Sequence, residues 1–328
     1  MEIIFEHRNY LPSMFFFLPA AMAFCVLTEK YSSRRTMLQF IFLFLTVFIF
    51  AQGHTVYMRN ALFQKPKLLW KDNAEKAPDL HRPHHNLANA YFVEGRIAEA
   101  LLETQKALQA KTPAVKGQKF ITWYNLGLFF LYEGSIQKAL ACYEKALEIK
   151  PSDARIYHKL AVASRIDGRL DNAEAYANEA LRRSRGSGVF LPTLGMILLQ
   201  KGKIEPVLQM AVEELKKPGS NNQWYYILGE ALRKKGELKR SALYFEIYAR
   251  LFPDQMAANA SLVEIFSLMG RESEKEWVAR RLFFQAGDIG LETVLKQYHR
   301  QYNTLDERRI ERIQNAVCQS LQCKTIFP

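Results

Sequence analysis

The residues with the clearest chemical potential are three histidines that lie close together, His81, His84 and His85. Their imidazole nitrogens are common metal ligands, so a metal site is one interpretation. Polar contacts within a helical fold are the alternative, and we favour it. The sequence shows no glycine-rich phosphate-binding loop, no serine nucleophile motif and no CxxC pair. We therefore expect no metal, no other cofactor and no catalytic activity.

The composition is that of a folded and mildly basic protein. The chain has 328 residues, 49% of them hydrophobic, and a formal net charge of +12. Its mean hydropathy of −0.17 excludes both a disordered chain and a protein that lies wholly in a membrane. The basic residues are spread along the chain, so we expect no nucleic-acid partner. Cys318 and Cys323 are either a disulfide pair or two free thiols.

Two uncharged segments near the N-terminus are long enough to cross a membrane. They extend over residues 9–28 and 36–58, and a spanning helix needs about 20 apolar residues. We expect transmembrane helices at about 11–28 and 36–56 that form a hairpin within residues 1–59. A signal peptide is the alternative for the first segment, but no basic stretch precedes it and a second apolar run follows at once.

The short loop between these segments predicts their orientation. It carries Lys30, Arg34 and Arg35 against the single acidic residue Glu29. Basic loops stay in the cytoplasm, so the chain after residue 59 should lie on the other side. We expect a multi-pass integral protein of a bacterial inner membrane or an equivalent membrane, with its large C-terminal region on the non-cytoplasmic side.

After residue 80 the sequence repeats itself with a constant period. Glycines recur at positions 134, 168, 202, 236 and 270, and each step is 34 residues. This period, with apolar residues at helical spacing, resembles the tetratricopeptide repeat (TPR) family over residues 81–289. The second repeat matches the family pattern at Trp123, Leu126, Gly127, Phe130, Gly134, Ala139, Tyr143, Ala146 and Pro151.

The resemblance implies an all-α fold, a right-handed superhelix of about six helix–turn–helix repeats. The repeats should start at residues 81, 120, 154, 188, 222 and 256. Each recurring glycine should occupy the turn between two helices, where a left-handed backbone is needed. We expect residues 60–80 to be a half-repeat connector and residues 290–328 to be capping helices, one of them opening at a capping box.

The segment Glu6–Ser13 resembles a second family. In GT-C membrane glycosyltransferases of the protein O-mannosyltransferase class, a similar Tyr-Leu-Pro-Ser stretch precedes the last membrane helices, and a TPR array follows them. The acidic catalytic motif of that family, which follows its first membrane helix, has no match here. This resemblance implies a substrate-recognition part of such an enzyme, without its catalytic region.

The TPR resemblance also implies a binding surface. Positions 2, 5, 6, 9, 12 and 13 of each repeat's first helix line the concave face, and some TPR co-chaperones bind a peptide carboxylate there. The matching residues here are His85, Asn89, Asn125, Arg155 and Lys159. Cations and amides that converge on a carboxylate form charge-assisted hydrogen bonds, and His85 would add a charge near pH 6. A solvated basic face is the alternative. The full predicted groove comprises His85, Asn86, Asn89, Tyr124, Asn125, Arg155, His158, Lys159 and Tyr226.

These features together predict a non-catalytic, membrane-anchored TPR scaffold that binds a protein or peptide outside the cytoplasm. The alternative function is the C-terminal recognition part of a GT-C glycosyltransferase, in which case a multi-pass glycosyltransferase would be the partner. In both cases the N-terminal hairpin would hold the chain in the membrane.

Overall fold

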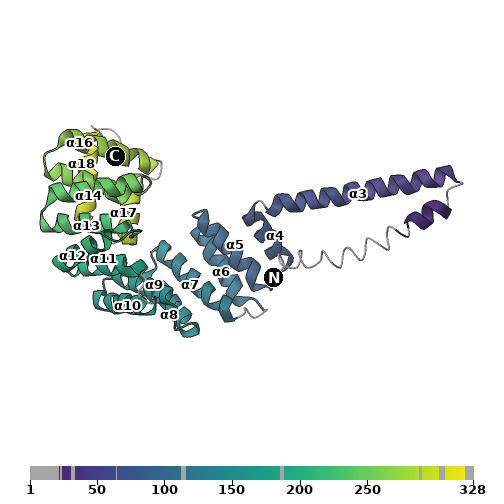
Figure 1. Cartoon of the computed structure of the whole chain (residues 1–328), viewed down its shortest axis with the longest axis horizontal. Helices are drawn as coiled ribbons and strands as arrows, with labels where there is room; N and C mark the ends of the chain where they lie inside the picture. Colours follow the sequence, from purple (N-terminus) through teal and green to yellow (C-terminus); the bar gives the residue numbers. More distant parts are fainter. Residues whose placement is uncertain are drawn as a thin grey trace. The chain divides into compact units, whose positions relative to one another are not determined.

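The computed structural model describes residues 22, 24–30, 34–63, 65–111, 116–184, 188–287, 290–302 and 307–321. Within these residues, all regular secondary structure is helical. The chain divides into two compact units, residues 1–72 and 73–328. Helix labels follow Figure 1. The helices are α3 (Arg35–Phe63), α4 (Pro66–Lys76), α5 (His81–Val93), α6 (Ile97–Gln109), α7 (Lys116–Glu133), α8 (Ile136–Ile149), α9 (Ala154–Ile166), α10 (Leu170–Arg183), η1 (Gly188–Phe190), α11 (Leu191–Gln200), α12 (Ile204–Leu215), α13 (Gln223–Lys235), α14 (Leu238–Leu251), α15 (Met256–Leu268), α16 (Glu272–Ala286), α17 (Leu291–Tyr302) and α18 (Glu307–Ser320).

The first unit contains the helix α3, which is 29 residues long. Among the described residues, its segment Arg35–His54 is the one stretch long and apolar enough to cross a membrane. The predicted helix at 36–56 is therefore present as a helix, and it continues further at its C-terminal end. Most of the other predicted span, residues 11–28, lies outside the described residues, and residues 24–30 are helical. The two-helix hairpin stays a prediction. So does the half-repeat connector, within which α4 supplies one helix.

The second unit consists of helix pairs, as the repeat pattern predicts. Among its described residues, the pairs are α5–α6, α7–α8, α9–α10, α11–α12, α13–α14 and α15–α16, each packed against the next (Figure 1). The helices α5, α9 and α15 begin at the predicted repeat starts. The all-α TPR superhelix is confirmed. Helix α7 begins at Lys116, four residues before the predicted start, within the insertion that separates the first two glycines.

Two glycines of the second repeat show why the repeat requires this residue. Gly134 in the turn has φ of 93°, a left-handed conformation that other residues rarely adopt. Gly127 in the middle of α7 has ordinary helical φ, but a Cβ atom there would lie 2.7 Å from Cε1 of Tyr143 on α8. The fully buried Ala139 likewise lets the paired helices approach closely. The sequence pattern thus encodes a turn and a close helix contact.

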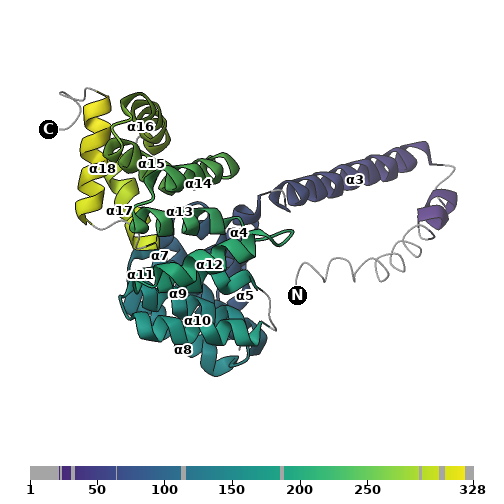
Figure 2. The same ribbon diagram turned by 60° about the vertical axis from the view of Figure 1, so that its left-hand side comes forward.

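The C-terminal helices follow a different course. Helix α18 packs against α15 and α16, as a capping helix would (Figure 2). Helix α17 contacts α15, α16 and α18, and it also contacts α9, a first helix three repeats earlier. Because first helices form the concave face of a TPR superhelix, this contact places α17 on the concave side.

Candidate functional site

A cavity of about 610 Å³ lies on the concave side of the second unit. Its walls come from α7, α9, α11, α13 and α14, from η1 and the residues before α13, and from α17. The cavity is lined by Leu128, Leu131, Tyr132, His158, Lys159, Val162, Arg165, Ile166, Val189, Phe190, Pro192, Thr193, Met196, Asn221, Gln223, Tyr226, Ile227, Tyr248, Thr293 and Lys296. Most residues from the repeats stand at the positions predicted to be concave. The volume is that of a ligand site, and the lining combines apolar and cationic side chains.

Lys159 is a cationic side chain of the cavity lining, together with Arg165 and with Lys296, which forms an ion pair with Glu292. The side chain of Lys159 is half-buried, and burial lowers the pKa of its ammonium group. Within the described residues, this ammonium group has no carboxylate partner, whereas Arg165 nearby is buried and contacts Gln200. A positive charge that is partly removed from water and unpaired is favourably placed for an anionic ligand.

His158 stands beside Lys159 and is neutral. Its Nε2 atom lies 2.8 Å from Oγ1 of Thr193, and its ring stacks on Phe190 with centroids 4.7 Å apart. Burial, followed by the charge of Lys159, lowers the pKa of His158 to about 4. The imidazole can therefore take part in hydrogen bonds at neutral pH without adding a second charge.

Aromatic and aliphatic side chains form the rest of the cavity wall. Phe190 and Met196 line the cavity, and so do Tyr226 and Tyr248, whose ring centroids are 5.4 Å apart. Such surfaces bind apolar or aromatic groups of a ligand by excluding water from both. The cavity is suited to a ligand that carries an anionic group next to an apolar one.

Three of the predicted groove residues form a separate hydrogen-bonded chain on α5 and α7. The Nδ2 atom of Asn125 donates to Oδ1 of Asn89 at 2.8 Å, and Nδ2 of Asn89 lies 3.2 Å from Nε2 of His85. The Nδ1 atom of His85 lies 3.0 Å from Oγ1 of Thr122. These side chains come together as the sequence predicts, but they are occupied with one another.

The predicted charge on His85 near pH 6 is wrong. Burial, and secondly the neighbouring His81, lowers the pKa of His85 to about 4. The ring is packed between the helices α5 and α7, where Thr122 and Asn89 contact both of its nitrogens. His85 is therefore neutral at pH 6 and supplies no cation to a carboxylate.

Arg155 makes its contacts with a near neighbour. Its Nε and Nη2 atoms lie 2.9 and 2.7 Å from the two carboxylate oxygens of Asp153, which also accepts from the backbone N–H of Arg155 at the start of α9. These hydrogen bonds hold the pKa of Asp153 well below its usual range. Tyr124 lies beside Tyr143, and burial raises its pKa. Asn86 is half-buried on α5.

The nine predicted residues thus fall into different places. His158, Lys159 and Tyr226 line the cavity, whereas the hydrogen-bonded chain and Arg155 lie on other parts of α5, α7 and α9. The contribution of α17 to the cavity was not predicted from the sequence, because that helix lies outside the repeat period.

The other two histidines of the cluster on α5 have hydrogen-bond partners. His81 Nε2 lies 2.8 Å from Oγ1 of Thr122, and His84 Nδ1 lies 2.6 Å from Oε2 of Glu103. No group of three or more metal-binding side chains occurs among the described residues. Cys318 lies on α18, and Cys323, its partner in the predicted disulfide, lies outside the described residues, so the choice between a disulfide and two thiols stays a prediction.

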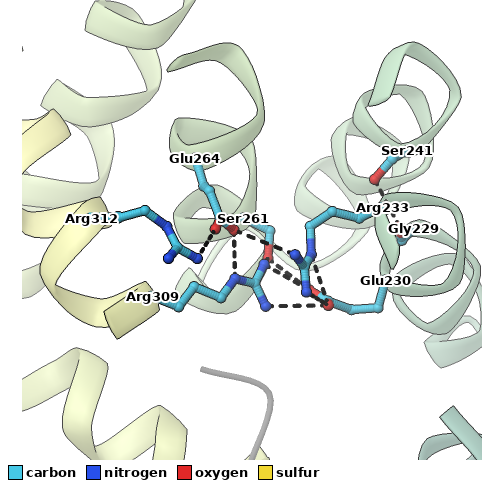
Figure 3. A network of polar contacts seen from close by, with 8 residues as sticks. All are labelled: Gly229, Glu230, Arg233, Ser241, Ser261, Glu264, Arg309 and Arg312. Carbon is cyan, nitrogen blue, oxygen red and sulfur yellow. Dashed lines mark hydrogen bonds and ion pairs between the residues drawn. The ribbon is translucent and has the colours of Figure 1, made fainter. Parts of the chain in front are cut away.

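A charged cluster near the C-terminal end of the superhelix was not predicted from the sequence. Glu230 and Glu264 occupy position 9 of the fifth and sixth repeats, and both are buried. Arg309 of α18 reaches both carboxylates (Figure 3). The matched glutamates at one repeat position were a signal in the sequence, whereas their partner follows 79 and 45 residues later.

Comparisons with known proteins agree with this architecture. Models of the tetratricopeptide repeat match residues 120–153, 142–175 and 194–255. The chain contains tetratricopeptide repeats. A TPR repeat-containing protein of Methanocaldococcus jannaschii, MJ1428, is 30% identical over 133 residues, which are 40% of this chain and 23% of that protein. The chain therefore matches about a quarter of the length of this relative.

One solved structure of low sequence identity has the same fold. The Cut9–Hcn1 hetero-tetramer of the APC/C superimposes with a TM-score of 0.59 at 14% identity, over 77% of this chain and 46% of that chain. YrrB, a TPR protein described as having an unusual peptide-binding site, superimposes with a TM-score of 0.41 at 18% identity, over 58% and 95% of the two chains. The resemblance of residues 6–13 to GT-C glycosyltransferases rests on residues outside the described part and stays a prediction.

Proposed function

We propose that this chain is a non-catalytic TPR interaction scaffold whose concave cavity binds an anionic segment of a protein partner. The observation that carries this proposal is the ammonium group of Lys159, which lies in a cavity with aromatic walls and has no carboxylate partner in the part of the chain that the structure describes. TPR superhelices bind peptides along their concave face, and the cavity lies on that face. A carboxylate next to an apolar side chain is the ligand chemistry that matches the lining.

The energetics favour a charged ligand over a neutral one. Burial disfavours the charged form of Lys159, and an adjacent carboxylate would restore it. A hydrogen bond to a charged group contributes about 1.5–3 kcal/mol, which corresponds to roughly ten-fold or more in affinity. Neutral His158 can accept or donate a further bond to the same ligand, and Phe190 and Met196 can cover an apolar group.

The test compares peptides that end in a free carboxylate with the same peptides as amides, on the full chain in detergent micelles. The free acids should bind more tightly than the amides. Lys159→Met should weaken binding of the free acids about ten-fold and should change binding of the amides little. Lys239→Met is the matched control, because Lys239 is exposed on α14 and should leave binding unchanged. Equal affinities for acids and amides across the set would contradict the proposal.

We further propose that α3 anchors the scaffold in a membrane and that the repeats lie on the non-cytoplasmic side. The apolar segment of α3 has none of its span buried within the protein, so a lipid environment would cover it. The basic residues Lys30, Arg34 and Arg35 directly before it support this orientation.

A further inference from the structure

Helix α17 forms part of the cavity wall although it lies outside the repeats. Leu291, Val294 and Leu295 are almost fully buried in the hydrophobic core of the last repeats. Thr293 and Lys296 are three positions apart, so they share another face of the helix, and both line the cavity. Because the buried face fixes α17, the backbone that carries Lys296 is held at a defined place beside the cavity.

The cavity has an excess of positive charge. Among the described residues that line it, Lys159, Arg165 and Lys296 are cationic, and none is an aspartate or a glutamate. Arg165 is buried, and its Nη1 atom donates to Oε1 of Gln200 at 3.4 Å. The ammonium groups of Lys159 and Lys296 come from α9 and α17, two helices that contact each other. The lining therefore offers two ammonium groups to one ligand.

The present partner of Lys296 holds it only weakly. Its Nζ atom lies 2.5 Å from Oε1 of Glu292, one turn earlier on α17, and about half of each side chain is exposed to solvent. Exposed ion pairs between residues four apart on a helix contribute little to stability, because water solvates both charges when they separate. A ligand carboxylate can therefore replace Glu292 at little cost.

The two lysines differ in their surroundings and so suit different groups of a ligand. Lys159 is half-buried and has no carboxylate partner in the described part of the chain, so it favours the first carboxylate strongly. Lys296 is exposed and adds a second ion pair to a ligand that Lys159 already holds. An acidic residue at the C-terminal end of a peptide carries two carboxylates, and a cavity of about 610 Å³ has room for both.

We propose that Lys296 is a specificity-determining residue of this cavity, which binds the side-chain carboxylate of a peptide ending in aspartate or glutamate. The role of Lys296 rests on the proposed function, in which Lys159 binds the main-chain carboxylate of the same terminal residue. Glu292 occupies Lys296 when no ligand is bound and competes with the ligand for it. The site therefore selects among free peptide ends by the charge of their last side chain.

The experiment uses the full chain in detergent micelles and four fluorescent peptides of one sequence. They end in aspartate or in asparagine, each as the free acid and as the amide. The aspartate acid should bind about two- to five-fold more tightly than the asparagine acid, the range expected for an ion pair at an exposed position. Lys296→Gln should abolish this preference for aspartate and leave the preference for free acids over amides unchanged.

Two further variants complete the test. Glu292→Gln removes the competitor of Lys296 and should increase the preference for aspartate. Lys239→Gln is the matched control, because it removes the same charge from an exposed position on α14 and should change neither preference. Lys296 and Glu292 are exposed and glutamine favours helices, so the buried face of α17 stays intact in these variants.

The four peptides separate the two roles. Equal binding of the aspartate and asparagine acids, or a preference for aspartate that persists in Lys296→Gln, would overturn the role of Lys296. A preference for free acids that remains in that case would leave the proposed function in place. Equal binding of acids and amides would overturn the proposed function, and the role of Lys296 with it.

Discussion

Two partly buried histidines, His85 and His158, hold neutral rings between helices of neighbouring repeats. Both have a pKa lowered to about 4, first by burial and second by a neighbouring cationic or ionisable group, His81 or Lys159. An unfolded histidine has a pKa of about 6.5. As the pH falls, the unfolded chain therefore binds protons before the folded chain does.

This difference predicts a loss of stability in acid. The contribution of each ring is fully present above pH 6.5 and decreases as the pH falls toward 4. A shift of one pKa unit corresponds to about 1.4 kcal/mol, so partial solvent exposure leaves roughly 1–2 kcal/mol for each ring by pH 5. The free energy of unfolding of the full chain, measured at pH 7 and pH 5, should fall accordingly.

The variant His158→Gln provides the control. Glutamine keeps a hydrogen-bonding group near Oγ1 of Thr193 but does not titrate. The loss of stability between pH 7 and pH 5 should be smaller in this variant by the contribution of one ring. An identical loss in both proteins would show that His158 is protonated in the folded state or exposed to solvent.

The residues of the binding surface were only partly predictable. Positions 5, 6 and 9 of each repeat are set by local helix geometry, so Lys159 and Tyr226 were placed on the concave face from the sequence. The pairing of the side chains could not be predicted in the same way, because Arg155 forms its hydrogen bonds with Asp153 at the start of its own helix. The contacts of Arg309 could not be predicted, since they depend on how a helix outside the repeat period packs against the repeats.

At the scale of the helix, a substitution of Gly127 tests how closely α7 and α8 pack within a repeat. A Cβ atom at this position would lie 2.7 Å from Cε1 of Tyr143, which is fully buried and cannot move aside. Gly127→Leu should therefore destabilise the second repeat by about 1–3 kcal/mol or more, as overpacked cores do. Thermal unfolding of the full chain, followed by circular dichroism, should begin at a lower temperature.

The same helix offers a matched control for this substitution. Gly117 lies in the first turn of α7, and a Cβ atom there meets nothing within 4 Å. Gly117→Ala should be neutral or slightly stabilising, because alanine restricts the unfolded chain and favours the helix. A melting curve that is lowered equally by both substitutions would contradict the assigned close contact between α7 and α8.

The helices themselves were predictable wherever the period held. The constant spacing of glycines predicted the turns, and several helices begin where the period places them. The start of α7 differs because five inserted residues break the period between Gly95 and Gly134. The course of α17 toward α9 could not be predicted, since an amphipathic helix does not reveal in its sequence which of two exposed surfaces it will cover.

At the scale of the whole molecule, the prediction concerns the side of the membrane on which the repeats lie. Lys30, Arg34 and Arg35 precede α3, and they should remain in the cytoplasm while α3 crosses. Alkaline phosphatase fused after Pro328 should be active in a bacterial host, and green fluorescent protein at the same site should be dark. Fluorescence without phosphatase activity would reverse the orientation.

The number of spans can be resolved in the same system. With one span or with two, the basic loop stays inside and the repeats stay outside, but the N-terminus is cytoplasmic with one span and external with two. Cleavage of an N-terminal tag by external protease on intact spheroplasts should occur if residues 11–28 form a second span.

The triple change Lys30→Glu, Arg34→Glu and Arg35→Glu removes the orienting charge, while Lys65 and Lys67 remain after α3. This variant should lose phosphatase activity and gain fluorescence, because the basic side of α3 is then the C-terminal one. Unchanged phosphatase activity would show that these three residues do not set the orientation.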